Sequence, residues 1–110
     1  MKKIFLWGTG ERTEYYILME YFQNCNIAGY ICSEKAETTY KGKPVLSLEE
    51  LVEHQEEVDY IVIANEFYEE IIKECDDKKI DLDKIVITDN IPLEPYKTYY
   101  QRVKMVSEDL

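Results

Sequence analysis

The hydrophobic positions of this chain fall into two patterns that follow one another along the sequence. Short runs dominated by apolar residues, typical of strands buried on both faces of a sheet, occupy residues 4–7, 27–32, 44–46, 60–64 and 84–88. Between them, apolar residues recur at the i, i+3, i+4 and i+7 spacing of one helix face. The clearest stripes are Tyr15, Leu18, Met19 and Phe22, and then Tyr68, Ile71, Ile72 and Cys75. The chain therefore alternates predicted strands with predicted helices.

This alternation predicts an α/β fold with a parallel sheet and right-handed crossovers. The simplest arrangement is a small Rossmann-like, doubly wound sheet of about five strands in the order 3-2-1-4-5, formed by residues 1–90. The strand at 44–46 is expected at the sheet edge, because Pro44 has no N–H to donate. The polar stretch 33–43 is expected to be a loop. Gly29, inside the second strand, indicates close packing against the first helix or strand.

Two of the predicted helices begin at a polar cap. Ser47 and Glu50 match a capping box, in which the serine hydroxyl accepts from a first-turn N–H and the glutamate reaches back. The helix that follows should end near His54. Asn65 comes directly after the strongest strand and is expected to cap the next helix.

The C-terminal stretch, residues 91–110, is predicted to be a linker or helix outside the minimal fold. Pro92 and Pro95 interrupt regular structure, and an amphipathic pattern follows them. Its apolar positions are Tyr96, Tyr99, Tyr100, Val103 and Val106. The pattern favours a last helix packed on the sheet; the alternative is a linker helix that packs on a partner or leads to a catalytic domain.

The stretch after the first strand has the composition of a phosphate-binding turn. Gly8 permits a sharp turn with positive φ, and Gly10 lets a ligand approach the backbone. With Thr9, Glu11 and Arg12 they form the first candidate binding segment, because the helix that begins near Glu11 would direct its free N–H groups at an anion. The third glycine of the dinucleotide fingerprint is replaced by Thr13.

Two other strand ends should meet this turn at the carboxyl edge of the sheet, where open α/β sheets bind ligands. At the end of the second strand, Cys32 stands where a dinucleotide-binding domain has an acidic residue for the ribose. The ribose would then be held by Ser33 or Glu34, or no dinucleotide binds. NAD is accordingly favoured less than another nucleotide. After the fourth strand, Asn65 and Glu66 complete the candidate cofactor-binding set.

Composition narrows the classes of function. With 110 residues the chain is long enough for one domain, and its net charge of -10 disfavours a large surface for nucleic acid or an anionic membrane. No apolar run approaches the ~20 residues of a membrane span, and the first residues do not resemble a signal peptide. The odd number of widely spaced cysteines indicates reduced thiols in a cytoplasmic protein.

No catalytic or metal-binding constellation is visible in the sequence. The single histidine, His54, has no neighbouring cysteine and is expected to be solvated, whereas Cys75 lies on a predicted core stripe. The helix glutamates are expected on solvated faces. Most of the ten tyrosines should cover apolar surface, although some could line a pocket or a partner surface: Tyr15, Tyr16, Tyr68 and Tyr96.

The series KKIFLWGTGERTEYYI, IAGYICSE, YKGKPVLSLEEL and VDYIVIANEFYEEI, between Lys2 and Thr88, resembles one family of domains. It is similar to the Rossmann-like N-terminal domain attached to bacterial sugar-modifying proteins, which include sugar acyltransferases, nucleotide-sugar dehydratases and polysaccharide-type methyltransferases. Matched residue by residue, Gly8, Thr9 and Gly10 correspond to the phosphate-binding turn. Gly42, Pro44 and Val45 correspond to the G-x-P-V pattern, and Asn65 with Glu66 to the end of the fourth strand.

The resemblance implies a non-catalytic binding module for a nucleotide, nucleotide sugar or related cofactor, linked to a transferase domain. Thr13 and Cys32 depart from the family pattern and weaken the case for NAD. Two alternatives stay open. One is the N-terminal fragment of a transferase that uses S-adenosylmethionine; the other is a degenerate interaction module that binds no ligand and forms a homodimer.

Overall fold

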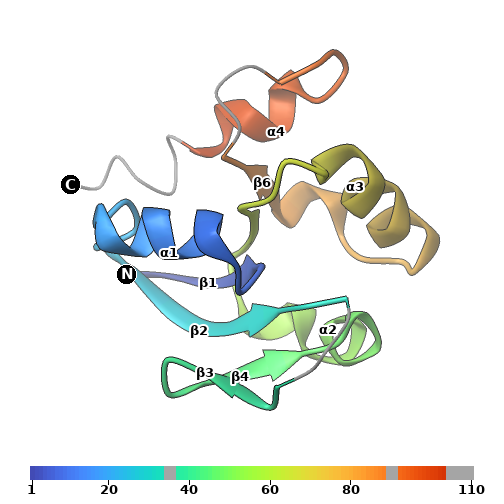
Figure 1. Cartoon of the computed structure of the whole chain (residues 1–110). Helices are drawn as coiled ribbons and strands as arrows, with labels where there is room; N and C mark the ends of the chain where they lie inside the picture. Colours follow the sequence, from blue (N-terminus) through green and yellow to red (C-terminus); the bar gives the residue numbers. More distant parts are fainter. Residues whose placement is uncertain (34–36, 89–91, 104–110) are drawn as a thin grey trace.

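A single twisted sheet organises the chain, and its order runs β3-β4-β2-β1-β5-β6. The computed structural model describes residues 1–33, 37–88 and 92–103 (Figure 1). Four of the five strand pairings are parallel, and the fifth is the antiparallel pairing of β3 with β4. The strands are β1 (Lys2–Trp7), β2 (Cys25–Ile31), β3 (Thr39–Tyr40), β4 (Lys43–Leu46), β5 (Tyr60–Ile63) and β6 (Ile85–Ile87).

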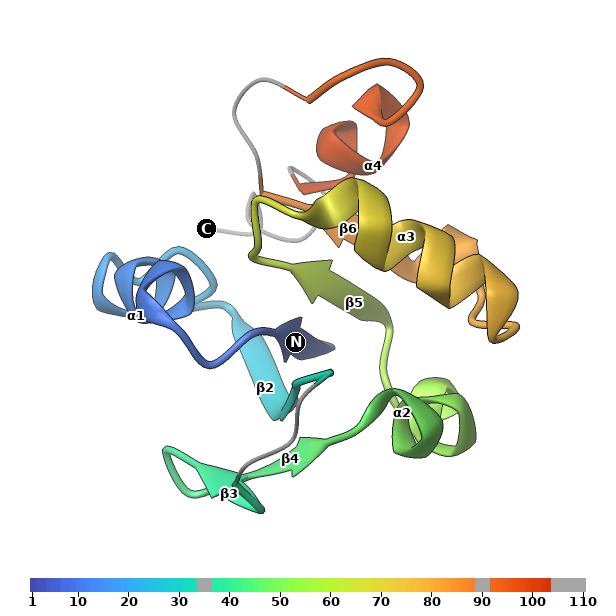
Figure 2. The same ribbon diagram turned by 45° about the vertical axis from the view of Figure 1, so that its right-hand side comes forward.

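Helices cover both faces of this sheet, so the fold is doubly wound. Figure 2 shows α1 on one side and α2 with α3 on the other. The two sides have separate cores: Leu6, Tyr16 and Val62 belong to the α1 side, and Phe5, Leu51 and Ile71 to the other. The helices are α1 (Glu11–Leu18), α2 (Leu48–His54), α3 (Tyr68–Asp77) and α4 (Lys97–Gln101), with short 3₁₀ turns η1 (Gln55–Glu57) and η2 (Leu82–Lys84).

The predicted order of the five parallel strands is confirmed, but a sixth strand was missed. The prediction of a loop over 33–43 is wrong where Thr39 and Tyr40 form β3, and the sheet edge is β3 rather than the strand that contains Pro44. Lys41 and Gly42 join the two strands with positive φ angles of 49° and 77°. Positive φ at both central residues is the geometry of a tight hairpin turn, which makes this antiparallel addition possible.

Gly29 marks a close approach within the sheet, as predicted, but the tightest contact is with β4 rather than with the first helix or strand. A Cβ placed on Gly29 would lie 2.9 Å from the carbonyl oxygen of Pro44 and 3.4 Å from the Phe5 ring. The pairing of β1 with β2 also shifts register between Ile4 and Phe5, where Ile4 faces Ile27 but Phe5 faces Gly29. Glycine is therefore required here by contact between neighbouring strands.

The prediction for the first helix is wrong in its buried face, and the predicted stripe extends to Phe22, beyond the end of the helix. The helix stops at Leu18, and three residues of the predicted inward stripe are mostly exposed: Tyr15 at 57%, Leu18 at 80% and Met19 at 60%. Thr13 and Tyr16 face the sheet instead. Five consecutive apolar residues, 15–19, surround the helix axis, so periodicity alone could not select the buried face.

The second and third helices follow their predicted patterns. Ser47 caps α2 and forms the full capping box with Glu50. In α3 the predicted stripe is buried along its whole length, from Tyr68 and Ile71 to Ile72 and Cys75. Burial raises the pKa of the Cys75 thiol to about 12, as expected for a core thiol, and none of the three cysteines forms a disulfide with another described residue.

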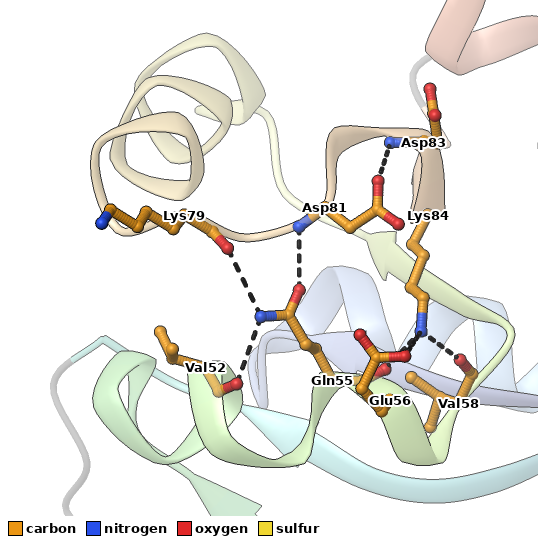
Figure 3. A network of polar contacts seen from close by, with 8 residues as sticks. All are labelled: Val52, Gln55, Glu56, Val58, Lys79, Asp81, Asp83 and Lys84. Atoms are coloured by element: carbon orange, nitrogen blue, oxygen red, sulfur yellow. Dashed lines mark hydrogen bonds and ion pairs between the residues drawn. The ribbon is translucent and has the colours of Figure 1, made fainter.

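A buried amide joins the two crossovers on the α2–α3 side, as Figure 3 shows. The Gln55 side chain, on a residue only 9% exposed, donates to the Val52 carbonyl at 3.1 Å and more weakly to the Lys79 carbonyl at 3.4 Å. It accepts from the Asp81 N–H at 2.8 Å. Lys84 donates to the Gln55 carbonyl at 2.7 Å. The turn after α2 is thereby tied to the turn after α3.

The last described helix packs on the body of the domain, beside β6. Tyr96, Tyr99 and Tyr100 pack against the core on the α2–α3 side, and Val103 is buried on the α1 side. The Arg102 guanidinium donates to the Leu82 and Ile85 carbonyls at 2.7 and 3.1 Å, respectively. The favoured prediction of a final packed helix is thus confirmed for α4, while Val106 lies outside the described residues.

The helices of the described residues are too short and too polar for any of them to cross a bilayer.

Candidate functional site

The carboxyl ends of β1, β2 and β5 lie next to one another at one edge of the sheet, where the strand order reverses between β1 and β5. After β1 the chain turns at Gly8, whose φ of 122° lies in the region that favours glycine. The Gly8 N–H donates to the Ile31 carbonyl at 2.8 Å, which binds this turn to the end of β2. These three strand ends form the position at which the sequence predicted a site.

Two adjoining depressions occupy this edge. One has a volume of about 520 Å³ and is bounded by the glycine turn, the start of α1 and the β5–α3 connection. The other, of about 580 Å³, lies toward the end of β2 and α3. They share four residues, which form the wall between them: Gly8, Gly10, Asn65 and Phe67.

The structure brings together eight of the nine predicted site residues. Six line the first depression, namely Gly8, Gly10, Glu11, Arg12, Asn65 and Glu66. Thr9 and Ser33 line the second, beside Cys32. Glu34, the alternative ribose ligand, lies outside the described residues. Proximity of these residues is therefore established, whereas their binding role stays a prediction.

Thr13, which replaces the third fingerprint glycine, forms the floor of the turn. It is fully buried, and a Cβ on Gly8 would lie only 3.0 Å from its hydroxyl oxygen. The helix approaches the first strand closely because Gly8, rather than residue 13, lacks a side chain. The Thr13 Oγ1 is buried without a hydrogen-bond partner in the described part of the chain. A buried hydroxyl without a hydrogen-bond partner lowers the free energy of unfolding by about 1–3 kcal/mol. The Thr13 residue that carries this hydroxyl belongs to the lining of the first depression.

Gly10 faces open space. A Cβ at this position would have no heavy atom within 4 Å among the described residues, and its φ of -93° is accessible to any residue. The packing of the domain therefore does not require glycine here. Gly10 is also the N-cap of α1, and helix geometry leaves the N–H groups of the first turn, from Glu11 to Thr13, without intrahelical acceptors.

Asn65 holds the β5–α3 connection in a local turn, but it is not the helix cap that the sequence predicted. Its Oδ1 accepts from the Phe67 N–H at 2.8 Å, which closes a local turn before the helix. The N-cap of α3 is Phe67, two residues later, and it has no side-chain cap. Phe67 is 58% exposed. Phe67 and Thr13 were not among the predicted site residues; the signal for Phe67 in the sequence was an aromatic residue just outside the stripe of α3, and the signal for Thr13 was its place at the third glycine of the fingerprint.

The charges around the site are mixed. Arg12 is the one cationic side chain on the described lining of the two depressions, and it forms no ion pair with another described residue. Glu11 and Glu66 line the first depression, and Glu70 and Glu74 the second. An anion would therefore rely on Arg12 and the N–H groups of α1, whereas the carboxylates suit hydroxyl or cationic groups.

The described residues contain no group of three or more His, Cys, Asp or Glu residues arranged to hold a metal ion. His54 lies away from the strand ends and pairs with Glu57 at the exposed end of α2. This carboxylate raises the pKa of His54, which is consistent with a surface ion pair.

Comparison with known protein families matches residues 1–86 to a domain described as C2185-like, N-terminal. The chain belongs to this family. The match extends from before β1 to the middle of β6, so the C2185-like domain includes all three strand ends of the site. No curated protein matches the chain. The Rossmann-like part of the predicted resemblance is thereby supported, while the association with sugar-modifying proteins stays a prediction.

Proposed function

We propose that this domain binds a nucleotide, a nucleotide sugar or a related cofactor at the carboxyl edge of its sheet. The observation that carries the proposal is the convergence of Gly8, Gly10 and Asn65 from separate strand ends around two depressions. A ligand phosphate would lie against the open face of Gly10 and receive hydrogen bonds from the first turn of α1. Arg12 would supply the neighbouring positive charge.

The proposed role is binding rather than stand-alone catalysis. The described residues gathered at the edge offer mainly N–H groups, hydroxyls and carboxylates, which suit the binding of a polar ligand. In the parent protein the domain would support a linked transferase that modifies a sugar or a polysaccharide. The N-terminal description of the family supports a role as one part of a larger protein.

Titration with candidate ligands tests the proposal. The panel contains NAD, S-adenosylmethionine, UDP- and CDP-sugars and coenzyme A, and the readout is the melting temperature. A ligand at ~100 times its Kd adds about 2.7 kcal/mol of stability, which for a domain of this size is a rise of roughly 10 °C. A flat response to the whole panel would contradict the proposal.

The Gly10→Val variant then tests whether the ligand binds at the glycine turn. Because residue 10 faces open space in an ordinary backbone conformation, valine should cost only the loss of a favourable N-cap residue, about 0.5–1 kcal/mol, which lowers the unliganded melting temperature by roughly 2–4 °C. It should remove the rise caused by the ligand. Thr39→Val, on the exposed edge strand, introduces the same side chain away from the site and should change neither value. Unchanged ligand affinity in Gly10→Val would place the ligand elsewhere.

One observation favours a second candidate function, an interaction module that forms a homodimer. Tyr15, Leu18 and Met19 expose an apolar face on α1, as an interaction surface would. Sedimentation equilibrium of wild type and Leu18→Asp distinguishes the two: a dimer that the substitution dissociates would favour this candidate, and a monomer at all concentrations would exclude it.

A further inference from the structure

Phe67 is a large aromatic residue whose side chain is exposed and does not belong to the buried core of the domain. Ala64 just after β5 and Tyr68 at the start of α3 are each only 3% exposed, whereas Phe67 is 58% exposed and follows the exposed Glu66. It lies on the lining of both depressions, on the wall that separates them. A large aromatic ring open to solvent at the centre of a candidate site is an available contact surface for a ligand.

The backbone that carries this ring is held in place on both sides. The Phe67 N–H donates to Asn65 Oδ1 at 2.8 Å, and the Phe67 carbonyl accepts from the Ile71 N–H at 3.2 Å. The next residue, Tyr68, anchors the start of α3 in the core, and its hydroxyl accepts from the Leu93 N–H at 2.9 Å. The backbone of Phe67 is thus held in place before any ligand arrives, which limits the backbone entropy lost on binding.

The mixed charges around the site indicate that attraction between charges is not the main source of ligand selectivity. Arg12 is opposed by the carboxylates of Glu11 and Glu66 on the same lining, and the whole chain carries a net charge of -10. Charge attraction for a phosphate is therefore weak. A contact that does not depend on charge must supply selectivity, and stacking of a planar ring on an aromatic side chain is such a contact.

We propose that Phe67 is the stacking residue of the site and that the ligand carries a planar heteroaromatic base. This inference rests on the proposed function and deepens it: it names the residue that recognises the base shared by the candidate ligands, and it predicts that a sugar phosphate without a base binds less tightly. The base lies on Phe67, and the phosphate or sugar reaches the open face of Gly10 across the shared wall.

The test compares compounds with and without a base on matched variants. The probes are ADP, UDP and S-adenosylmethionine, with ribose 5-phosphate as the compound that lacks a base, and calorimetry measures each Kd. Phe67→Leu keeps an apolar side chain but removes the planar face. Met19→Ala truncates a side chain of similar exposure, 60%, that lines neither depression. Circular dichroism melts check that both variants are folded.

With the wild-type domain, at least one compound that carries a base should bind roughly 5- to 150-fold more tightly than ribose 5-phosphate. Phe67→Leu should remove most of that ratio while the Kd of ribose 5-phosphate stays within about twofold. Met19→Ala should preserve the ratio. Saturation transfer to the ligand should be strongest at the base protons in the wild type and should weaken there in Phe67→Leu.

Two results overturn the inference while the proposed function stands: an unchanged ratio in Phe67→Leu, or ribose 5-phosphate that binds the wild type as tightly as the compounds with a base. If neither the four compounds nor the wider panel of nucleotide sugars, NAD and coenzyme A binds the wild type, the proposed function fails and the inference fails with it. The two failures are therefore distinguished by the wild-type titrations alone.

Discussion

Replacement of Gln55 by leucine should destabilise the domain, because this one side chain connects two crossovers. Gln55→Leu keeps most of the side-chain volume but removes three hydrogen bonds, to Val52 at 3.1 Å, Lys79 at 3.4 Å and Asp81 at 2.8 Å. At about 1 kcal/mol for each of the two shorter bonds and somewhat less for the longest, the loss is roughly 2.5–3 kcal/mol. Burial of the leucine methyl groups offsets up to about 1 kcal/mol. The expected change is about 2 kcal/mol.

Urea unfolding measures this change directly. Trp7 is the single tryptophan and is only 2% exposed at the end of β1, so its fluorescence reports unfolding of the sheet. The midpoint for Gln55→Leu should fall with an unchanged m-value, and the melting temperature should drop by roughly 8 °C.

Glu56→Gln is the matched control, because it alters the same network at its exposed rim. The Glu56 side chain is 87% exposed and lies 3.8 Å from Lys84 Nζ. Exposed ion pairs of this kind contribute about 0–1 kcal/mol, so the variant should stay close to wild type. A Gln55→Leu protein within about 0.5 kcal/mol of wild type, or as stable as Glu56→Gln, would refute the view that the buried amide stabilises the crossovers.

Two further predictions follow from individual contacts. Gly29→Ala should lower the free energy of unfolding by about 1–3 kcal/mol, since its Cβ would lie 2.9 Å from a backbone oxygen of the neighbouring strand; a neutral effect in denaturant would show that the strands can separate locally. The single histidine should titrate above its ordinary pKa of 6.5, because the Glu57 carboxylate favours the charged ring of His54. Its contribution to stability is present in full below pH 6.5 and is lost as pH rises through the folded-state pKa. An NMR titration of the imidazole proton should show this raised pKa in wild type and a return toward 6.5 in Glu57→Gln.

The parallel part of the fold was predictable because its signals are local and unambiguous. The apolar runs at β1 and β5 are short and rich in β-branched and aromatic residues, which favours a buried strand over a helix. The stripe in α3 leaves a single choice of buried face, because the other residues of that helix are charged. In α1, where residues 15–19 are all apolar, the same reasoning selected the wrong face. The orientation of α1 depends on the Gly8 turn and on the contact of Thr13 beneath it, which are tertiary features.

The candidate site was predictable for a different reason. Topology places the carboxyl ends of parallel strands together, so Gly10 and Asn65 could be expected to meet without knowledge of any side-chain contact. Phe67 and Thr13 could not be recognised in the same way. Whether an aromatic residue is exposed, or a hydroxyl is left without a partner, depends on what surrounds it in space.

Periodicity and chain connectivity were therefore enough to predict the α/β class, the order of the parallel strands and the sheet edge at which the candidate site lies. The antiparallel β3, the exposed face of α1 and the exposed ring of Phe67 became known only from the assembled fold. The physical reason is that β3 is two residues long and gains its stability from pairing with β4, and that burial is a property of neighbours. Such neighbours are assembled only when the whole sheet has formed.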